Sequence, residues 1–193
     1  MRIRSLAAIL LLVAAPRGGQ SLSLPLPPRP ANAPTATAFI AEIRDLPRQA
    51  REGRIVGELL SGNVPSWNRT WVPIVMRRTL GSSVVRVTFW ALPDYLAVGS
   101  DDDWFLVPLS PEMALRVAQV VGASLPTPLM VDAIWSEATV KLGADSIAPS
   151  AAMITVPVFA EHNAMVRARR AANPAPLGSL TAGHKQDVVL PPH

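Results

Sequence analysis

The sequence predicts an α+β fold, with a small antiparallel sheet against which an αα-hairpin and a further C-terminal helix pack. Strand-like segments follow one another between residues 83 and 109, and two helix-start signals then come in succession at Ser110 and Thr127. Strands and helices are therefore grouped, not alternating as in βαβ units. The 193 residues, 49% of them hydrophobic, suffice for one domain with its own core, expected over residues 37–193.

The chain opens with a segment that is typical of an export signal. Arg2 and Arg4 form a short positive start, and residues 6–15 are an uninterrupted apolar run followed by Pro16. A permanent membrane anchor needs roughly 20 apolar residues, so this run is too short to be one. The sequence therefore predicts a periplasmic or secreted protein with no stable membrane anchor after cleavage.

The signal peptide is expected over residues 1–21, and cleavage at residue 33 is the alternative, because Ala31-Asn32-Ala33 has the A-x-A form. Residues 22–36 are rich in proline, which favours an extended linker of polyproline type.

Two helices are expected at the start of the domain. Phe39, Ile40 and Ile43 have helical spacing, so a short helix is predicted to end near Pro47. A second helix is predicted over about residues 48–60.

Strands dominate the next part of the chain. Residues 63–69 are turn-like, and residues 83–91 are rich in β-branched and aromatic side chains, which predicts a half-buried strand. Two further strands, 95–98 and 104–109, are joined by residues 99–103, a sequence that is typical of a hairpin connection.

Helices follow. Ser110 and Thr127 each precede a proline, a pattern that starts helices, and the two helices are expected to form an αα-hairpin. Another helix is predicted over 159–172, and a last strand over 184–190. The chain ends directly after that strand, which is interpreted either as an edge strand or as the sign of a C-terminally truncated domain.

The charge distribution argues against a nucleic-acid partner. Four of the 18 basic residues lie in the first 33 residues, which contain no acid, and the remaining 14 balance the 14 acidic residues. A nucleic-acid-binding protein needs a basic face, and only Arg167, Arg169 and Arg170 cluster in the body of the chain.

Familiar catalytic motifs are missing from the sequence. It contains no cysteine, which excludes thiol nucleophiles, thiolate metal sites and disulfides. It also lacks the nucleophile elbow G-x-S-x-G, the zinc motif H-E-x-x-H and the dinucleotide motif G-x-G-x-x-G. No cofactor is expected.

The run Asp101-Asp102-Asp103 is the densest cluster of carboxylates and the one candidate metal site, for Ca²⁺. The alternative is a solvated hairpin tip, where Asp favours turn conformations.

Four residues are candidates for acid–base catalysis. His162 lies in the predicted helix 159–172, on a face shared with Phe159, and is expected to point inward. His184, Lys185 and Asp187 follow Gly183, which allows close approach of the backbone. In this hypothesis His162 and His184 act as the acid and the base of the reaction. Asp187 orients an imidazole, and Lys185 stabilises negative charge.

Three segments carry a resemblance to a known group: GSDDDWFLVPLSP (99–111), LPTPLMVDAIW (125–135) and AGHKQDVV (182–189). Together they resemble a family of uncharacterised exported bacterial proteins, over roughly residues 80–190. The resemblance implies no activity, but it implies that relatives continue past the His-Lys-x-Asp segment with further histidines.

The leading functional hypothesis is a cell-envelope hydrolase that acts on wall polymer or a small envelope ligand. The alternative is a non-catalytic module that binds carbohydrate or peptide, with Trp67 and Trp71 stacking on the ligand from a loop.

Overall fold

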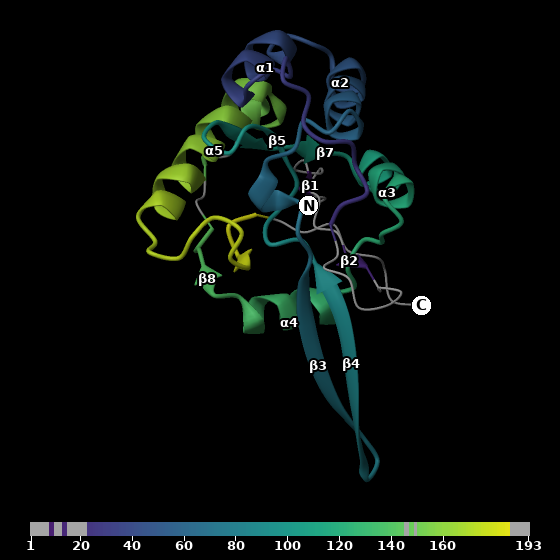
Figure 1. Ribbon diagram of the computed structural model, residues 1–193. Coiled ribbons are helices and arrows are strands. Elements are labelled where there is room, and N and C mark those ends of the chain that lie inside the picture. The colour runs from purple at the N-terminus through teal and green to yellow at the C-terminus, as the bar shows by residue number, and fades with distance from the viewer. Residues whose placement is uncertain (1–7, 10–12, 15–22, 145–146, 149, 186–193) are drawn as a thin grey trace.

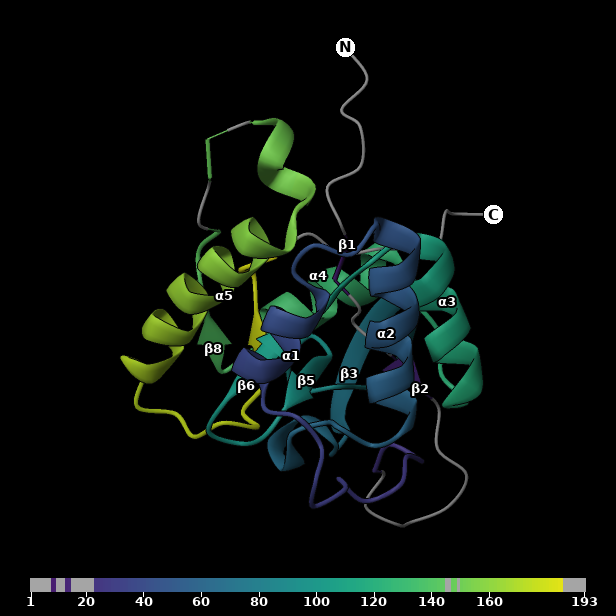
Figure 2. The ribbon, with the colours of Figure 1, turned by 90° about the horizontal axis from the view of Figure 1, so that it is seen from above.

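A computed structural model of the chain describes residues 8–9, 13–14, 23–144, 147–148 and 150–185. It confirms the α+β class: helices surround several small sheets (Figures 1 and 2), and one long hairpin projects from the body (Figure 1). The described helices are α1 (Ala36–Ile43), α2 (Arg48–Leu60), α3 (Pro111–Val120), α4 (Pro128–Glu137) and α5 (Val156–Ala171), with the short 3₁₀ helices η1 (Ser66–Asn68) and η2 (Ala151–Ile154).

Strand pairing is spread over several small sheets. The described strands are β1 (Ala8–Ile9), β2 (Val13–Ala14), β3 (Val72–Leu80), β4 (Ser83–Ala91), β5 (Ala97–Gly99), β6 (Trp104–Leu106), β7 (Pro108–Leu109), β8 (Val140–Lys141) and β9 (Thr181–Ala182). The sheets β1-β7, β2-β4-β3 and β5-β6 are antiparallel, as predicted, but they do not merge into one sheet. The pair β8-β9 is parallel.

The sequence signals for helix starts are confirmed. The hydroxyl groups of Ser110 and Thr127 accept hydrogen bonds from the backbone N–H of Met113 and Met130, both at 3.4 Å. Each helix then has proline at its first position.

The prediction of an αα-hairpin is wrong. Helix α3 packs against α2 and β7, whereas α4 packs against β3 and β9. The apolar faces of the two helices also pack in different places: Val117 of α3 belongs to one hydrophobic cluster, and Ile134 of α4 belongs to another.

The core thus consists of two clusters, and the β5–β6 hairpin lies between them. Val98 and Phe105, directly opposite each other, belong to the cluster formed with α1, α2 and α3. Ala97 and Leu106 point to the other side, into the cluster formed with α4 and the base of the β3–β4 hairpin. Alternation along these short strands therefore couples the two clusters.

Four residues of the predicted leader are among the described residues: Ala8 and Ile9 pair with β7, and Val13 and Ala14 with β4. Most of residues 1–21 lies outside the described residues, so the signal peptide stays a prediction. No helix in the described part of the chain is both long and apolar enough to cross a membrane.

The segment predicted as a linker packs against the body. Leu24 is buried, and the guanidinium of Arg29 donates to Asn63 Oδ1 at 2.9 Å and to the backbone oxygen of Gly99 at 3.0 Å. Arg29, counted above with the basic leader, therefore fixes residues 23–35 to the domain.

Candidate functional site

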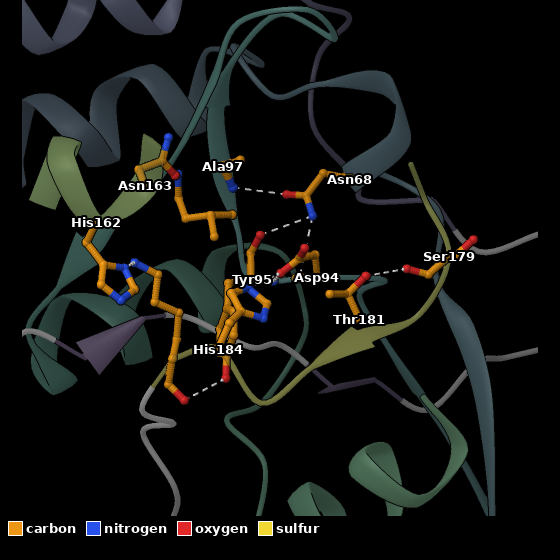
Figure 3. Close-up of polar contacts among 11 residues, drawn as sticks. Asn68, Asp94, Tyr95, Ala97, His162, Asn163, Ser179, Thr181 and His184 are labelled. Carbon is orange, nitrogen blue, oxygen red and sulfur yellow. Dashed lines mark hydrogen bonds and ion pairs between the residues drawn. The ribbon is translucent and has the colours of Figure 1, made fainter. Parts of the chain in front are cut away.

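The candidate site is assembled from the loop between β4 and β5, helix α5, and the segment that follows β9. The loop contributes Asp94 and Tyr95, the helix contributes His162, and the segment contributes His184 (Figure 3). Lys185 follows His184 in the same segment. Three of the four residues predicted for acid–base chemistry are thus found in one cluster. The fourth, Asp187, lies outside the described residues.

His184 and Asp94 form a buried pair. Their exposed fractions are 1% and 3%, and His184 Nε2 lies 3.1 Å from Asp94 Oδ1. That is an ion-pair distance, but the contact does not meet hydrogen-bond geometry, and neither ring nitrogen of His184 has a hydrogen-bond partner among the described residues. A buried imidazole held only by a poorly aligned contact is unusual, because buried polar atoms are nearly always hydrogen-bonded.

Backbone and amide contacts hold Asp94 in place. Its Oδ1 accepts from the N–H of Tyr95 at 2.7 Å. Asn68, in η1, donates to the backbone oxygen of Tyr95 at 3.2 Å and accepts from the N–H of Ala97 at 3.0 Å. Burial lowers the pKa of Arg170, and the negative charge of Asp94 acts in the opposite direction. Asp94 therefore interacts with the guanidinium of Arg170 and also lies against the imidazole of His184.

A second pair joins α5 to the end of the described chain. Lys185 Nζ contacts Nδ1 of His162, and the hydroxyl of Tyr95 donates to the backbone oxygen of Lys185 at 3.2 Å. The Tyr95 ring also meets the His184 ring edge to face, with centroids 5.0 Å apart. Tyr95 thus connects the two pairs (Figure 3).

A small pocket adjoins the cluster. Its volume is about 180 Å³, and its lining includes Tyr95, Trp135, Thr181 and Gly183. Such a pocket accommodates a small group of a ligand and not a whole polymer chain, because drug-sized ligands occupy about 300–1,000 Å³.

Sequence reasoning placed His162 incorrectly and missed Asp94. The buried face of α5 carries Asn163 and Val166, and His162 lies half-buried beside it. Asn163 occupies the inner position because its amide accepts from the N–H of Leu106 at 3.0 Å and donates to the oxygen of Trp104 at 3.0 Å. Asp94 gave only a weak signal, a carboxylate between Pro93 and Tyr95 in a connection between strands.

The Asp101–Asp103 run anchors loops in the structure through hydrogen bonds to separate segments. Asp101 accepts from the N–H and the hydroxyl of Ser66, both at 2.6 Å. Asp103 accepts from the N–H of Thr37 at 2.8 Å and from Arg167 at 2.9 Å. Among the described residues, no group of three or more His, Asp or Glu side chains could hold a metal ion.

The tryptophans proposed for ligand stacking are packed inside. Trp71 is 6% exposed and belongs to the core cluster formed with α1, α2 and α3. Trp67 is half-buried and meets Trp104 edge to face at 5.2 Å. The prediction that they stand exposed in a loop is wrong, because Trp71 packs inside one core cluster and Trp67 packs against the other.

The three basic residues near the end of α5 form hydrogen bonds within the protein. Arg167 bonds to Asp103, Arg169 to the backbone oxygen of Gly143, and Arg170 to that of Ala175. They tie α5 to neighbouring loops.

Comparisons of the chain with family models, with curated proteins and with solved structures found no match.

Proposed function

We propose that the protein is a cell-envelope hydrolase whose proton-transfer groups are the His184–Asp94 and Lys185–His162 pairs. The observation that carries the proposal is the buried imidazole of His184, which sits against a carboxylate, lacks hydrogen bonds within the described residues and adjoins a second pair through Tyr95. Buried polar groups without hydrogen bonds are rare in proteins, and a catalytic role is one of the recognised explanations for such a group.

In this proposal His184 is the general base. Asp94 stabilises the imidazolium that forms when His184 takes a proton from water, because opposite charges 3.1 Å apart in a buried site attract strongly. Asp94 therefore has the orienting role that the sequence hypothesis gave to Asp187.

Lys185 and His162 form the acid side. An ammonium group can only donate, so Nδ1 of neutral His162 accepts from Lys185 and Nε2 carries the proton. In hydrolysis, the water oxygen bonds to the substrate carbon as its proton moves to His184. The bond to the leaving group breaks as that group takes the Nε2 proton, and Lys185 passes its own proton to Nδ1. Exchange with solvent restores both pairs.

Release of soluble fragments from purified bacterial wall sacculi tests the proposal. The full chain is incubated with sacculi, and new reducing ends and new amino groups are measured separately, which distinguishes glycosidic from amide cleavage. We expect release by the wild type and a loss of about 10²–10⁴-fold in His184→Gln and Asp94→Asn, the range that acid–base groups contribute.

Asp45→Asn is the matched control, because Asp45 is exposed on the surface beyond α1. His162→Gln tests the same site at a half-buried position, where folding is less at risk than at His184. Fragment release that His162→Gln and His184→Gln leave unchanged, or no release by folded wild type, would overturn the proposal.

A further inference from the structure

The β3–β4 hairpin extends well beyond the body of the molecule (Figure 1). Every residue from 77 to 88 is exposed, and within the described residues another strand pairs with the hairpin only at Trp90 and Ala91, through β2. A two-stranded ribbon is marginally stable by itself in water. We therefore expect residues 77–88, the outer hairpin, to function in contact with a partner.

The outer hairpin is layered along its length. Its last two rungs are Thr79–Val84 and Leu80–Ser83, and Leu80 and Val84 are 64% and 69% exposed. The two-residue turn beyond them has Gly81 at its first position with φ of 61°, which fits a type II′ turn. Apolar side chains thus stand at the far end of the molecule.

Arginines occupy the two rungs directly behind the tip. Arg77 and Arg86 lie opposite each other, and Arg78 is paired with Val85. Like charges facing each other across a ribbon are destabilising, and none of the three makes an ion pair within the described residues. No acidic residue occurs between Glu58 and Asp94 in the sequence. This local excess of positive charge favours binding to an anionic partner.

The order of the layers fits a lipid surface. About three residues separate the Arg77–Arg86 rung from Leu80, which is about 10 Å of strand. That matches the roughly 5–10 Å to which apolar groups of peripheral proteins enter a bilayer while basic residues remain at the phosphates. Charged side chains on an edge strand, such as Arg77 and Arg78 on β3, oppose the addition of a partner strand.

We infer that the β3–β4 hairpin docks the protein on an anionic phospholipid surface, with Leu80 and Val84 entering the bilayer and Arg77, Arg78 and Arg86 contacting lipid phosphates. This inference is independent of the hydrolase proposed above. Binding is reversible, because it rests on a few apolar side chains and three cations.

Co-sedimentation of the full chain with vesicles tests it. Vesicles of phosphatidylcholine alone are compared with vesicles that also contain phosphatidylglycerol, at low and raised salt. We expect binding only to the anionic vesicles and weakening by salt. Each arginine near an anionic surface changes binding by about fivefold, so R77Q/R78Q/R86Q is expected to bind about a hundredfold more weakly.

The control R44Q/R48Q/R116Q removes the same charge from exposed positions in α2 and α3 and directly after α1. For the apolar tip, L80S/V84S is compared with L115S/V120S, which alters two exposed apolar residues of α3. Equal losses in the hairpin variants and their controls would contradict the inference, as would equal binding to neutral vesicles. Binding to duplex DNA, or self-association, without vesicle binding would assign the hairpin to another partner.

A single label gives an independent readout. Since the chain has no cysteine, Ser82→Cys at the turn takes one environment-sensitive fluorophore. Its emission is expected to shift to the blue with anionic vesicles, whereas the same label at Gln119→Cys on α3 stays unchanged. No shift at position 82 would overturn insertion of the tip.

Discussion

At the scale of single residues, carboxylates of this protein organise loops and helix ends. Asp103 illustrates it: one oxygen accepts from the N–H of Thr37 in the first turn of α1, and the other from Arg167 of α5. The carboxylate thereby satisfies a free N–H of the helix start and also complements the helix dipole. Glu52 does the same for α3, accepting from the N–H and the hydroxyl of Ser110 at 3.1 and 2.8 Å.

The contacts of Asp103 predict an acid-dependent loss of stability. Burial alone would raise the pKa of Asp103, but hydrogen bonds from Thr37 and Arg167 outweigh it and hold the pKa below its ordinary value. The folded chain therefore binds fewer protons at this site than the unfolded chain. The stabilisation is complete above the unfolded pKa of about 3.9 and is lost as pH falls through the folded pKa.

Asp103→Asn is accordingly expected to lower the free energy of unfolding at neutral pH, with the difference from wild type shrinking below about pH 4. Urea unfolding at a series of pH values measures it. Asp45→Asn, at an exposed position, should stay within about 0.5 kcal/mol of wild type throughout. A destabilisation by Asp103→Asn that is the same at every pH would contradict this account.

At the scale of elements, the short β8–β9 pair brings the catalytic candidates to the loop that carries Asp94. The N–H of Thr181 donates to the backbone oxygen of Pro93 at 2.7 Å, and Gly183 then turns the chain so that His184 enters the core. Gly183 has φ of 95°, and a Cβ there would lie 2.2 Å from a ring atom of Trp135 and 2.6 Å from the backbone oxygen of Leu142. Only glycine fits this turn.

Gly183→Ala is expected to destabilise the protein by about 1–3 kcal/mol, from the strained φ and the close contacts. Gly53→Ala is the matched control: Gly53 lies inside α2 with nothing within 4 Å of the added Cβ. That variant should be more stable than wild type by about 0.5–1 kcal/mol, because alanine favours helix. Chemical denaturation of both variants provides the test, and equal effects would refute the role given to Gly183.

At the scale of the whole molecule, two hydrophobic clusters share one small hairpin. Phe105 of β6 enters one cluster, and its neighbours Trp104 and Leu106 enter the other. Helix α5 also contributes to both, through Val156 and Val166. Neither cluster can lose its packing without exposing the other side of these elements, so the two clusters should unfold as one unit.

Heating should therefore give one transition, with the same midpoint by far-ultraviolet circular dichroism and by tryptophan fluorescence. Ile43→Ala lies in the cluster with α1, α2 and α3, and Ile134→Ala lies in the cluster with α4. Each should lower the free energy of unfolding by about 2–5 kcal/mol and shift both signals together. Separate midpoints, or a variant that shifts only one signal, would show that the clusters unfold independently.

The sequence predicted the helices well because their starts are local. The caps Ser110 and Thr127, each followed by proline, are confirmed in the structure, and so are the bounds of α2. The long strand β3 was missed, because residues 72–80 carry Pro73 and a run of exposed residues without alternation. A projecting ribbon lacks the one-sided burial that produces a strand signal.

By itself, then, the sequence determined the α+β class, the helix starts and the candidates His162, His184 and Lys185, because these depend on local patterns and residue chemistry. Only the tertiary structure decided that α3 and α4 separate, that His184 meets Asp94, and that Asn163 rather than His162 faces the core. Those outcomes depend on contacts between residues far apart in the chain, such as the 90 positions between His184 and Asp94. Local periodicity carries no information about which distant surface a side chain will meet.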